Sequence, residues 1–309
     1  GPARLSDRFG QRGVLSPMQW VEVAPAKINL FLHVGPVEAD GYHPLSSLVA
    51  FADVGDMLIL DPDGPPGLSV VGPFADALIR DPAGQAGNLV LRALAGLGAA
   101  TGLETSSLSL TLDKRLPVAA GVGGGSADAG AALRLARRYL APDLEDPVLV
   151  QVASGLGADG LMCLASTPAW AEGKGEVLTP EPRLPTLHAV LVNPGVPSPT
   201  GAVYGAYDRL GVGGADRPAG PASWDAEAVI GWLAAQRNDL EAPALLNTPA
   251  IGTALDAVRA EGQARLVRMS GSGATVFGLY DDAATAARAA GALEGAHPDW
   301  WVRQARLGA

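Results

Sequence analysis

Residues 117–130 read PVAAGVGGGSADAG and carry the strongest local signal in the chain. Gly121 and the three glycines at 123–125 stand between a predicted strand and a predicted amphipathic helix that opens near Ser126. The backbone N–H groups of such a turn can point into one concavity, and the start of the helix adds partial positive charge. The stretch therefore predicts a site for a nucleotide phosphate, although a bare glycine run could also be a structural turn.

Two better-known phosphate motifs do not fit this stretch. A Walker A loop requires a Lys-Ser/Thr pair that is missing, and Ser126 replaces the third glycine of the dinucleotide fingerprint. A literal fingerprint occurs at residues 155–160, GLGADG, but there a helix-like stretch precedes it and LMCLAS, read as a strand, follows it. The fingerprint requires the opposite order, so a dinucleotide-dependent oxidoreductase is rejected.

Strand and helix patterns on both sides of the glycine stretch favour an α+β fold, because they do not alternate regularly. A strand is expected within 21–34, where Pro25 indicates an edge or a bulge. Two apolar runs after the turn at Gly41 are expected to form two more strands. Further strands are expected at 108–118 and 187–195, and two within 265–280. Helices are expected at 88–102, 126–141, 223–236 and 248–262.

Composition excludes several classes of protein. The chain has 309 residues, a length that predicts one or two globular domains. Its formal net charge of −10 argues against nucleic-acid binding. No apolar run reaches the roughly 18 residues of a membrane helix, so no membrane partner is expected. The single cysteine, Cys163, fits a reducing, cytoplasmic location. Residues 1–17 are expected to be a tag or a disordered extension.

Lys27 and Asp159 are the candidate charged groups. Lys27 lies in the apolar segment PAKINLFL, where a lysine either reaches solvent along its stem or meets a carboxylate. Asn29 follows on the same side of the strand. Asp159, in the GLGADG turn, is either a turn former or a functional carboxylate.

Three segments together resemble the GHMP kinase superfamily. They are PAKINLFLHV with ADGYH, LPVAAGVGGGSADAGAAL, and MSGSGATVFGLY, supported by LGAD, AEGKGEVLTP, NPGVPSPT and RNDLEAPAL. The resemblance runs from about Met18 almost to the C-terminus. It implies a two-domain α+β GHMP kinase fold with the active site in the interdomain cleft, an N-terminal domain at 18–176 and a C-terminal domain at 177–309.

The resemblance also implies the catalytic roles. Asp159 would be the base and Lys27 its charged partner, with ATP as phosphoryl donor and Mg²⁺ near the Ser126 hydroxyl. The ATP phosphates would lie on eleven consecutive residues, which are Pro117, Val118, Ala119, Ala120, Gly121, Val122, Gly123, Gly124, Gly125, Ser126 and Ala127.

For the second substrate, the resemblance points to the branch that phosphorylates the 2-hydroxyl of a cytidine diphosphate-linked methylerythritol, in non-mevalonate isoprenoid synthesis. Tyr42 and Tyr204 would sandwich the cytosine, and His43 would hydrogen-bond its edge. Thr200, Asn29 and Asp159 would line the methylerythritol end, and Gly271, Ser272 and Gly273 would close the site beside the phosphates.

The sequence departs from the family at two points. Residues 160–163, GLMC, replace the usual segment after the base, so its predicted supporting strand is expected to pack differently, and Ala127 replaces a common serine. Two alternatives stay open: a homoserine- or mevalonate-type GHMP kinase, and a non-catalytic nucleotide-binding regulator. The protein is expected to be a monomer or a homodimer.

Overall fold

The computed structural model describes residues 20–80, 88–211 and 213–308, so the predicted extension at 1–17 lies outside the described residues. The chain forms two compact units that interleave in sequence. The first consists of Gly1–Pro25, Gly55–Val118 and Gly124–Ala165, and the second of Ala26–Val54, Ala119–Gly123 and Ser166–Ala309. The domain boundary expected at residue 176 stays a prediction.

Two long strands contribute to both units. Strand β1 (Val21–Val34) pairs with β2 (Leu45–Leu60), its only strand partner in the described part of the chain, which agrees with the edge position expected from Pro25. Strand β2 replaces the two separate runs expected there. It continues through Gly55, where a Cβ would lie 2.3 Å from the Ala24 carbonyl oxygen, so the missing side chain allows the close approach.

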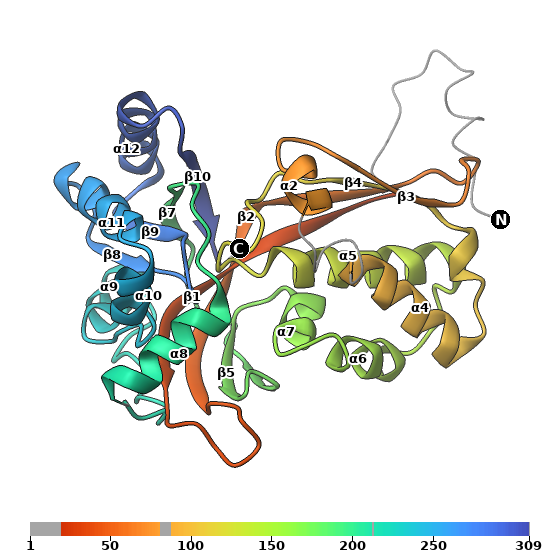
Figure 1. Ribbon diagram of the computed structural model, residues 1–309, viewed down its shortest axis with the longest axis horizontal. Coiled ribbons are helices and arrows are strands. Elements are labelled where there is room, and N and C mark those ends of the chain that lie inside the picture. Colours follow the sequence, from red (N-terminus) through yellow and green to blue (C-terminus); the bar gives the residue numbers. More distant parts are fainter. Residues whose placement is uncertain (1–19, 81–87, 212, 309) are drawn as a thin grey trace. The chain divides into compact units, whose positions relative to one another are not determined.

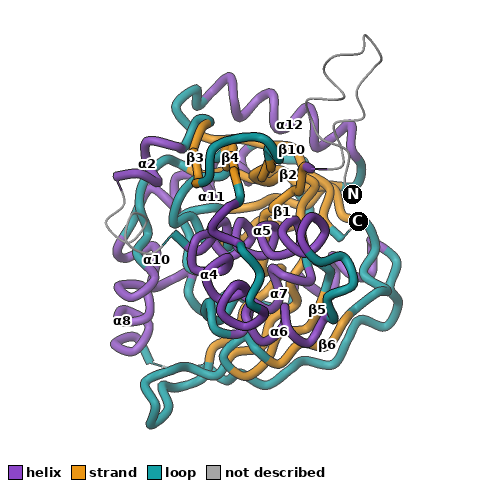
Figure 2. The backbone as a smooth tube through the Cα atoms, turned by 90° about the vertical axis from the view of Figure 1, so that its right-hand side faces the viewer, coloured by secondary structure: helices purple, strands orange, loops and turns teal. Residues whose placement is uncertain are grey.

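The first unit packs helices against three strands. Strand β3 (Gly67–Val71) runs parallel to β4 (Ser109–Asp113), and β4 pairs antiparallel with the last residues of β2. The helices α4 (Leu89–Thr101), α5 (Gly124–Leu140), α6 (Asp146–Ser154) and α7 (Gly160–Ala165) lie side by side (Figures 1 and 2). The short elements are α2 (Ala75–Arg80) and η2 (Thr105–Ser107).

The second unit is built on a sheet in the order β2–β10–β7–β9–β8. In addition, β5 pairs with the first residues of β2, Leu45–Val49, and β6 pairs with β5. Its strands are β5 (Ala169–Gly173), β6 (Val177–Pro180), β7 (Leu187–Asn193), β8 (Leu266–Met269), β9 (Val276–Tyr280) and β10 (Trp301–Leu307). Its helices are α8 (Thr200–Leu210), α9 (Ala226–Ala234), α10 (Glu241–Asn247), α11 (Ala250–Ala260) and α12 (Ala283–Ala296). Helices α11 and α12 pack on this sheet and bury an aliphatic core with it.

The predicted α+β class is confirmed, but one local prediction is wrong. The segment LMCLAS was expected to be a strand after Asp159, whereas residues 160–165 form helix α7. Two of its apolar side chains, Met162 and Cys163, are buried, so the apolar run reflects burial of a short helix. The fingerprint at 155–160 still fails, because helix α6 precedes it.

None of the helices in residues 20–80, 88–211 and 213–308 is long and apolar enough to cross a membrane. Helix α5, for example, has 17 residues and carries Arg134, Arg137 and Arg138.

Gly130 allows α5 to approach α7, and its substitution tests this packing. A Cβ at Gly130 would lie 2.5 Å from the backbone oxygen of Cys163. We expect Gly130→Ala to lower the free energy of unfolding by about 1–3 kcal/mol, measured by urea denaturation. Gly291→Ala in α12, where a Cβ meets open space, is the control and should raise it by roughly 0.5–1 kcal/mol. Equal effects of the two substitutions would contradict the packing.

Candidate active site

The three motifs recognised in the sequence meet in the second unit through backbone and hydroxyl hydrogen bonds. The Lys27 N–H donates to the Val122 carbonyl oxygen at 2.8 Å. The Ser270 hydroxyl accepts from the Asn29 N–H at 3.1 Å and donates to the Gly121 carbonyl oxygen at 3.1 Å. One serine therefore joins strand β1, the glycine loop and the loop after β8.

The glycine loop fits against the third motif only because it lacks side chains. Gly121 has φ +76°. A Cβ there would lie 2.5 Å from the backbone carbonyl oxygen of Ser270 and 2.8 Å from the backbone nitrogen of Gly273. Ala119 and Gly123 also have positive φ, at 52° and 63°. A chain that alternates in this way turns its N–H groups toward one side, as the predicted phosphate cradle requires.

Asn29 offers one buried acceptor to a ligand. The Ser47 hydroxyl donates to the Phe31 carbonyl oxygen at 2.5 Å, so it must accept from Asn29, which identifies the group 2.9 Å away as the amide Nδ2. The opposite atom, Oδ1, is buried and has no hydrogen-bond partner in the part of the chain that the structure describes. A buried acceptor without a donor costs free energy unless a ligand supplies one.

The loop Ser270–Thr275 between β8 and β9 is longer than the three-residue hairpin loop that the sequence indicates. Asn238 holds its start, because its Nδ2 donates to the carbonyl oxygens of Met269 at 2.8 Å and Gly271 at 2.9 Å. The Ser272 hydroxyl lies 2.9 Å from the hydroxyl of Thr200, the first residue of α8. The predicted substrate residues Thr200, Gly271, Ser272 and Gly273 are thus brought together.

Helix α8 presents three side chains four residues apart on one face. Thr200 contacts the third motif, and Tyr204 lies against His43 with ring centroids 4.8 Å apart. One turn further, Asp208 Oδ1 lies 2.7 Å from Nε2 of His43. The structure therefore brings His43, Tyr204 and Asp208 together, and the base-binding roles of His43 and Tyr204 stay predictions.

Tyr42 lies 59% exposed in the loop between β1 and β2. The Lys174 ammonium lies 4.6 Å from the centroid of its ring and forms an ion pair with Asp40. The hydrogen bond from Lys174 lowers the pKa of Asp40, and the same bond raises the pKa of Lys174. The sandwich of a base between Tyr42 and Tyr204 stays a prediction.

In the first unit, Pro117 and Val118 lead toward the glycine loop, and α5 begins at Gly124, two residues before the predicted start at Ser126. Gly125 is exposed, Ser126 is half-buried and Ala127 is buried. The first turn of this helix therefore leaves backbone N–H groups for an anion. Beneath it lies a charged cluster that sequence reasoning missed.

Lys114 forms that cluster with two buried carboxylates. Its ammonium lies 2.5 Å from Asp56 Oδ2 and 2.9 Å from Asp128 Oδ2, and a Cβ on Gly124 would lie 3.1 Å from it. Asp56 Oδ1 also accepts from the N–H groups of Arg115 at 2.6 Å and Leu116 at 2.7 Å. The cluster thus ties β2 and the segment after β4 to the start of α5.

Burial and charge oppose each other in this cluster. Burial lowers the pKa of Lys114, but the charges of Asp128 and Asp56 outweigh it, so the net shift is upward. Burial raises the pKa of Asp128 well above its usual range, against the attraction of Lys114. The ammonium therefore stays charged at neutral pH.

Asp159 is half-buried and stands directly before α7. Its carbonyl oxygen accepts from the Cys163 N–H at 3.0 Å, which makes its backbone part of the first turn. A Cβ on Gly160 would lie 2.1 Å from the Ala153 oxygen of α6, so glycine is required at this position. The GLMC departure therefore keeps Asp159 at a helix start, not beside a strand.

No group of three or more His, Cys, Asp or Glu side chains in the described ranges could hold a metal ion. Mg²⁺ commonly keeps several waters and is bound through one or two carboxylates together with substrate phosphates. The half-buried Ser126 hydroxyl could supply one oxygen to such an ion, and its role as a Mg²⁺ ligand stays a prediction.

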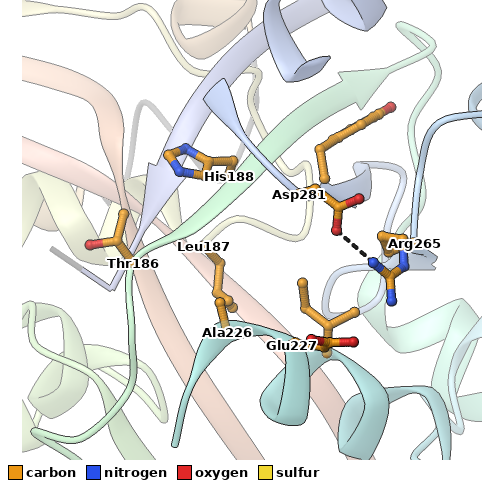
Figure 3. Close-up of a pocket in the computed structure, with 9 residues that line it drawn as sticks. Thr186, Leu187, His188, Ala226, Glu227, Arg265 and Asp281 are labelled. Carbon is orange, nitrogen blue, oxygen red and sulfur yellow. Dashed lines mark hydrogen bonds and ion pairs between the residues drawn. The ribbon is translucent and has the colours of Figure 1, made fainter. Parts of the chain in front are cut away.

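A separate cavity of about 260 Å³ contains none of the predicted site residues (Figure 3). It lies near Thr186, Leu187 and His188 at the start of β7, and Arg265 forms an ion pair with Asp281 there at 2.6 Å. Because His188 pairs with Tyr280 while Val192 pairs with Val276, this cavity lies at the other end of the β7–β9 ladder from the third motif.

Sequence reasoning missed Lys114, Asp128, Asn238, Lys174 and Asp208. Asp208 could have been found, since it follows Tyr204 by four residues on one helical face. Asn238 stands in the recognised segment RNDLEAPAL, and Lys174 in AEGKGEVLTP. Asp128 stands in the recognised segment LPVAAGVGGGSADAGAAL, but its pairing with Lys114 depends on the tertiary fold and could not be found from either segment alone.

Family profiles and curated relatives of this chain point to the same family. The profile described as GHMP kinases N terminal domain matches residues 88–166, and the profile described as GHMP kinases C terminal matches residues 226–299. A relative from Caulobacter vibrioides (strain NA1000 / CB15N), named 4-diphosphocytidyl-2-C-methyl-D-erythritol kinase, is 54% identical over 287 residues, which are 92% of this chain and 98% of that relative.

Solved structures agree with that match. A crystal structure of 4-(cytidine 5'-diphospho)-2C-methyl-D-erythritol kinase is 34% identical with a TM-score of 0.75, covering 94% of this chain and 99% of that chain. Homoserine kinase from Cytophaga hutchinsonii has a TM-score of 0.61 at 18% identity, covering 95% of this chain and 96% of that chain. The second likeness concerns the fold alone.

Removal of the Lys114 charge tests the cluster beneath α5. We expect Lys114→Met to cost about 3–5 kcal/mol of unfolding free energy, because it leaves two buried carboxylates without their cation. Arg115→Met is the matched control, since Arg115 is 53% exposed in its pair with Asp113, and should cost less than about 1 kcal/mol. Urea denaturation measures both, and a similar small loss for the two variants would contradict the role of the cluster.

Proposed function

The chain belongs to the GHMP kinase family, among the 4-diphosphocytidyl-2-C-methyl-D-erythritol kinases, and on that basis we propose that it phosphorylates 4-diphosphocytidyl-2-C-methyl-D-erythritol with ATP. The γ-phosphoryl group goes to the 2-hydroxyl, and ADP is the second product. The observation that carries the proposal is the junction at Ser270, where β1, the glycine loop and the third motif are hydrogen-bonded together.

Backbone groups support the assignment of ATP. Positive φ at Ala119, Gly121 and Gly123 and the open first turn of α5 are two features that suit anionic oxygens. Phosphoryl transfer depends mostly on positioning and on neutralising charge, which such a segment supplies. Mg²⁺ stays part of the proposal: Ser126 would hold it, and it would neutralise phosphate charge when bound.

Asp159 and Lys27 are proposed as the catalytic pair. The 2-hydroxyl oxygen forms a bond to the γ-phosphorus as its proton passes to the Asp159 carboxylate, and the bond from that phosphorus to the bridging oxygen of ADP breaks. Lys27 stabilises negative charge on the attacking oxygen. Asn29 supports this end of the substrate, because its buried Oδ1 can accept from a substrate hydroxyl.

The aromatic residues favour a cytidine substrate over the small substrates of other GHMP kinases. Ring faces for a base would come from Tyr204, which lies beside His43, and from the exposed Tyr42. Homoserine and mevalonate have no base that could stack on these rings. Stacking contributes about 1–3 kcal/mol per base. A non-catalytic regulator is disfavoured because Lys27 and Asp159 are both present.

We propose that the reaction serves non-mevalonate isoprenoid synthesis in the cytoplasm, by a monomer or a homodimer.

Asp159→Asn tests both the reaction and the base. The wild-type protein should release ADP with the cytidine substrate and not with homoserine or mevalonate, in a coupled assay. Asp159→Asn should lower turnover at least about 100-fold, since general-base catalysis contributes 10²–10⁴-fold, while ATP binding by calorimetry stays unchanged.

Asp146→Asn is the control for that variant, because Asp146 is 82% exposed at the start of α6, and it should retain full turnover. Full activity of Asp159→Asn would remove Asp159 from the mechanism. ADP release with homoserine or mevalonate alone would overturn the proposed substrate.

A further inference from the structure

We propose that Asp208 fixes the protonation pattern of the His43 ring and thereby makes the site select cytosine over uracil. The inference rests on the proposed function and deepens it, because it names the residue that sets base specificity. Asp208 is a positioning residue, since it acts through His43.

The contact between His43 and Asp208 determines which ring nitrogen of the neutral imidazole carries the proton. Nε2 of His43 lies 2.7 Å from Asp208 Oδ1. An ionised carboxylate only accepts hydrogen bonds, so Nε2 must be the donor. In the neutral imidazole, Nδ1 is then an unprotonated acceptor.

An acceptor at Nδ1 distinguishes the two pyrimidines. Cytosine carries an amino group at position 4, which donates, and uracil carries a carbonyl oxygen there, which accepts. An Nδ1 lone pair can accept from the cytosine amino group, but it would face the uracil oxygen with no proton between them. A buried mismatch of this kind is penalised more strongly than a missing contact.

Packing keeps the ring in the orientation that Asp208 selects. The His43 side chain is only 8% exposed, and the Tyr204 and Tyr207 rings lie 4.8 Å and 5.6 Å from it between centroids. Tyr207 is itself fixed, because its hydroxyl donates to the Val34 carbonyl oxygen and accepts from the Gly213 N–H at 3.0 Å. A ring flip that exchanged the two nitrogens would have to displace these neighbours.

All three of these contacts come from one face of α8. Tyr204, Tyr207 and Asp208 stand at positions i, i+3 and i+4, so the helix presents them together. This arrangement places the carboxylate beside His43, the residue that the family resemblance assigns to the base edge, and Asp208 is 42% exposed, so water reaches its far side.

Asp208→Asn tests the inference by reversing the pattern. The asparagine amide can donate to Nε2, which moves the ring proton to Nδ1 and turns that atom into a donor suited to uracil. We would titrate cytidine diphosphate and uridine diphosphate into wild-type protein and into Asp208→Asn by calorimetry. The wild-type preference for the cytidine ligand should fall about tenfold or more in the variant, the effect of roughly one charge-assisted hydrogen bond.

A second readout follows the ring itself. Nitrogen-15 NMR of His43 should show a protonated Nε2 and an unprotonated Nδ1 in the wild-type protein, and the reverse in Asp208→Asn. Asp256→Asn is the matched control in the same unit, because Asp256 is 79% exposed on α11, and it should change neither readout. In turnover, Asp208→Asn should raise KM for the cytidine substrate and leave kcat within about threefold, since it touches no reacting atom.

Each result decides the inference. Equal affinity of wild-type protein for the two diphosphates, or an unchanged preference in Asp208→Asn, would overturn it. These binding results do not depend on turnover. Failure of the wild-type protein to release ADP with the cytidine substrate would instead overturn the proposed function.

Discussion

The approach of the Gly121 backbone to the loop that begins at Ser270 is the constraint on which the second unit depends. A Cβ at Gly121 would lie 2.5 Å from the backbone carbonyl oxygen of Ser270, so the two backbones can approach only because Gly121 has no side chain. This approach allows the Ser270 hydroxyl to bond both Gly121 and the Asn29 N–H. Segments more than 200 residues apart, at Asn29 and Ser270, thereby become one site.

The acidic composition acquires a different meaning in this setting. A net charge of −10 argues against nucleic acid, yet the proposed substrates are two polyanions. The groups proposed to meet them are local: backbone N–H groups at the glycine loop, the start of α5, and Lys27. The Lys114 cation does not belong to this set, because Asp56 and Asp128 neutralise it within the core. Its role is to hold the start of α5 in place.

Much of the site could be predicted because it is encoded in contiguous segments. The glycine stretch, the paired Lys27 and Asn29 on β1, and the loop at 271–273 each have a local signature. The segment after Asp159 was predicted as a strand, since a six-residue apolar run fits a buried strand or a short helix equally well. Asp128 stands in the recognised glycine-rich segment, but its pairing with Lys114 could not be predicted, because the two residues come from different elements and only the fold brings them together. Asp208 could have been predicted, because it follows Tyr204 by four residues on one face of the helix.

Phosphorus-31 NMR directly follows the proposed transfer of a phosphoryl group to the cytidine-linked polyol. With ATP, Mg²⁺ and 4-diphosphocytidyl-2-C-methyl-D-erythritol, we expect loss of the γ-phosphate signal and growth of the ADP signals and of a new phosphomonoester signal in equal amounts. Release of inorganic phosphate in place of the phosphomonoester, or an unchanged ATP spectrum, would contradict it.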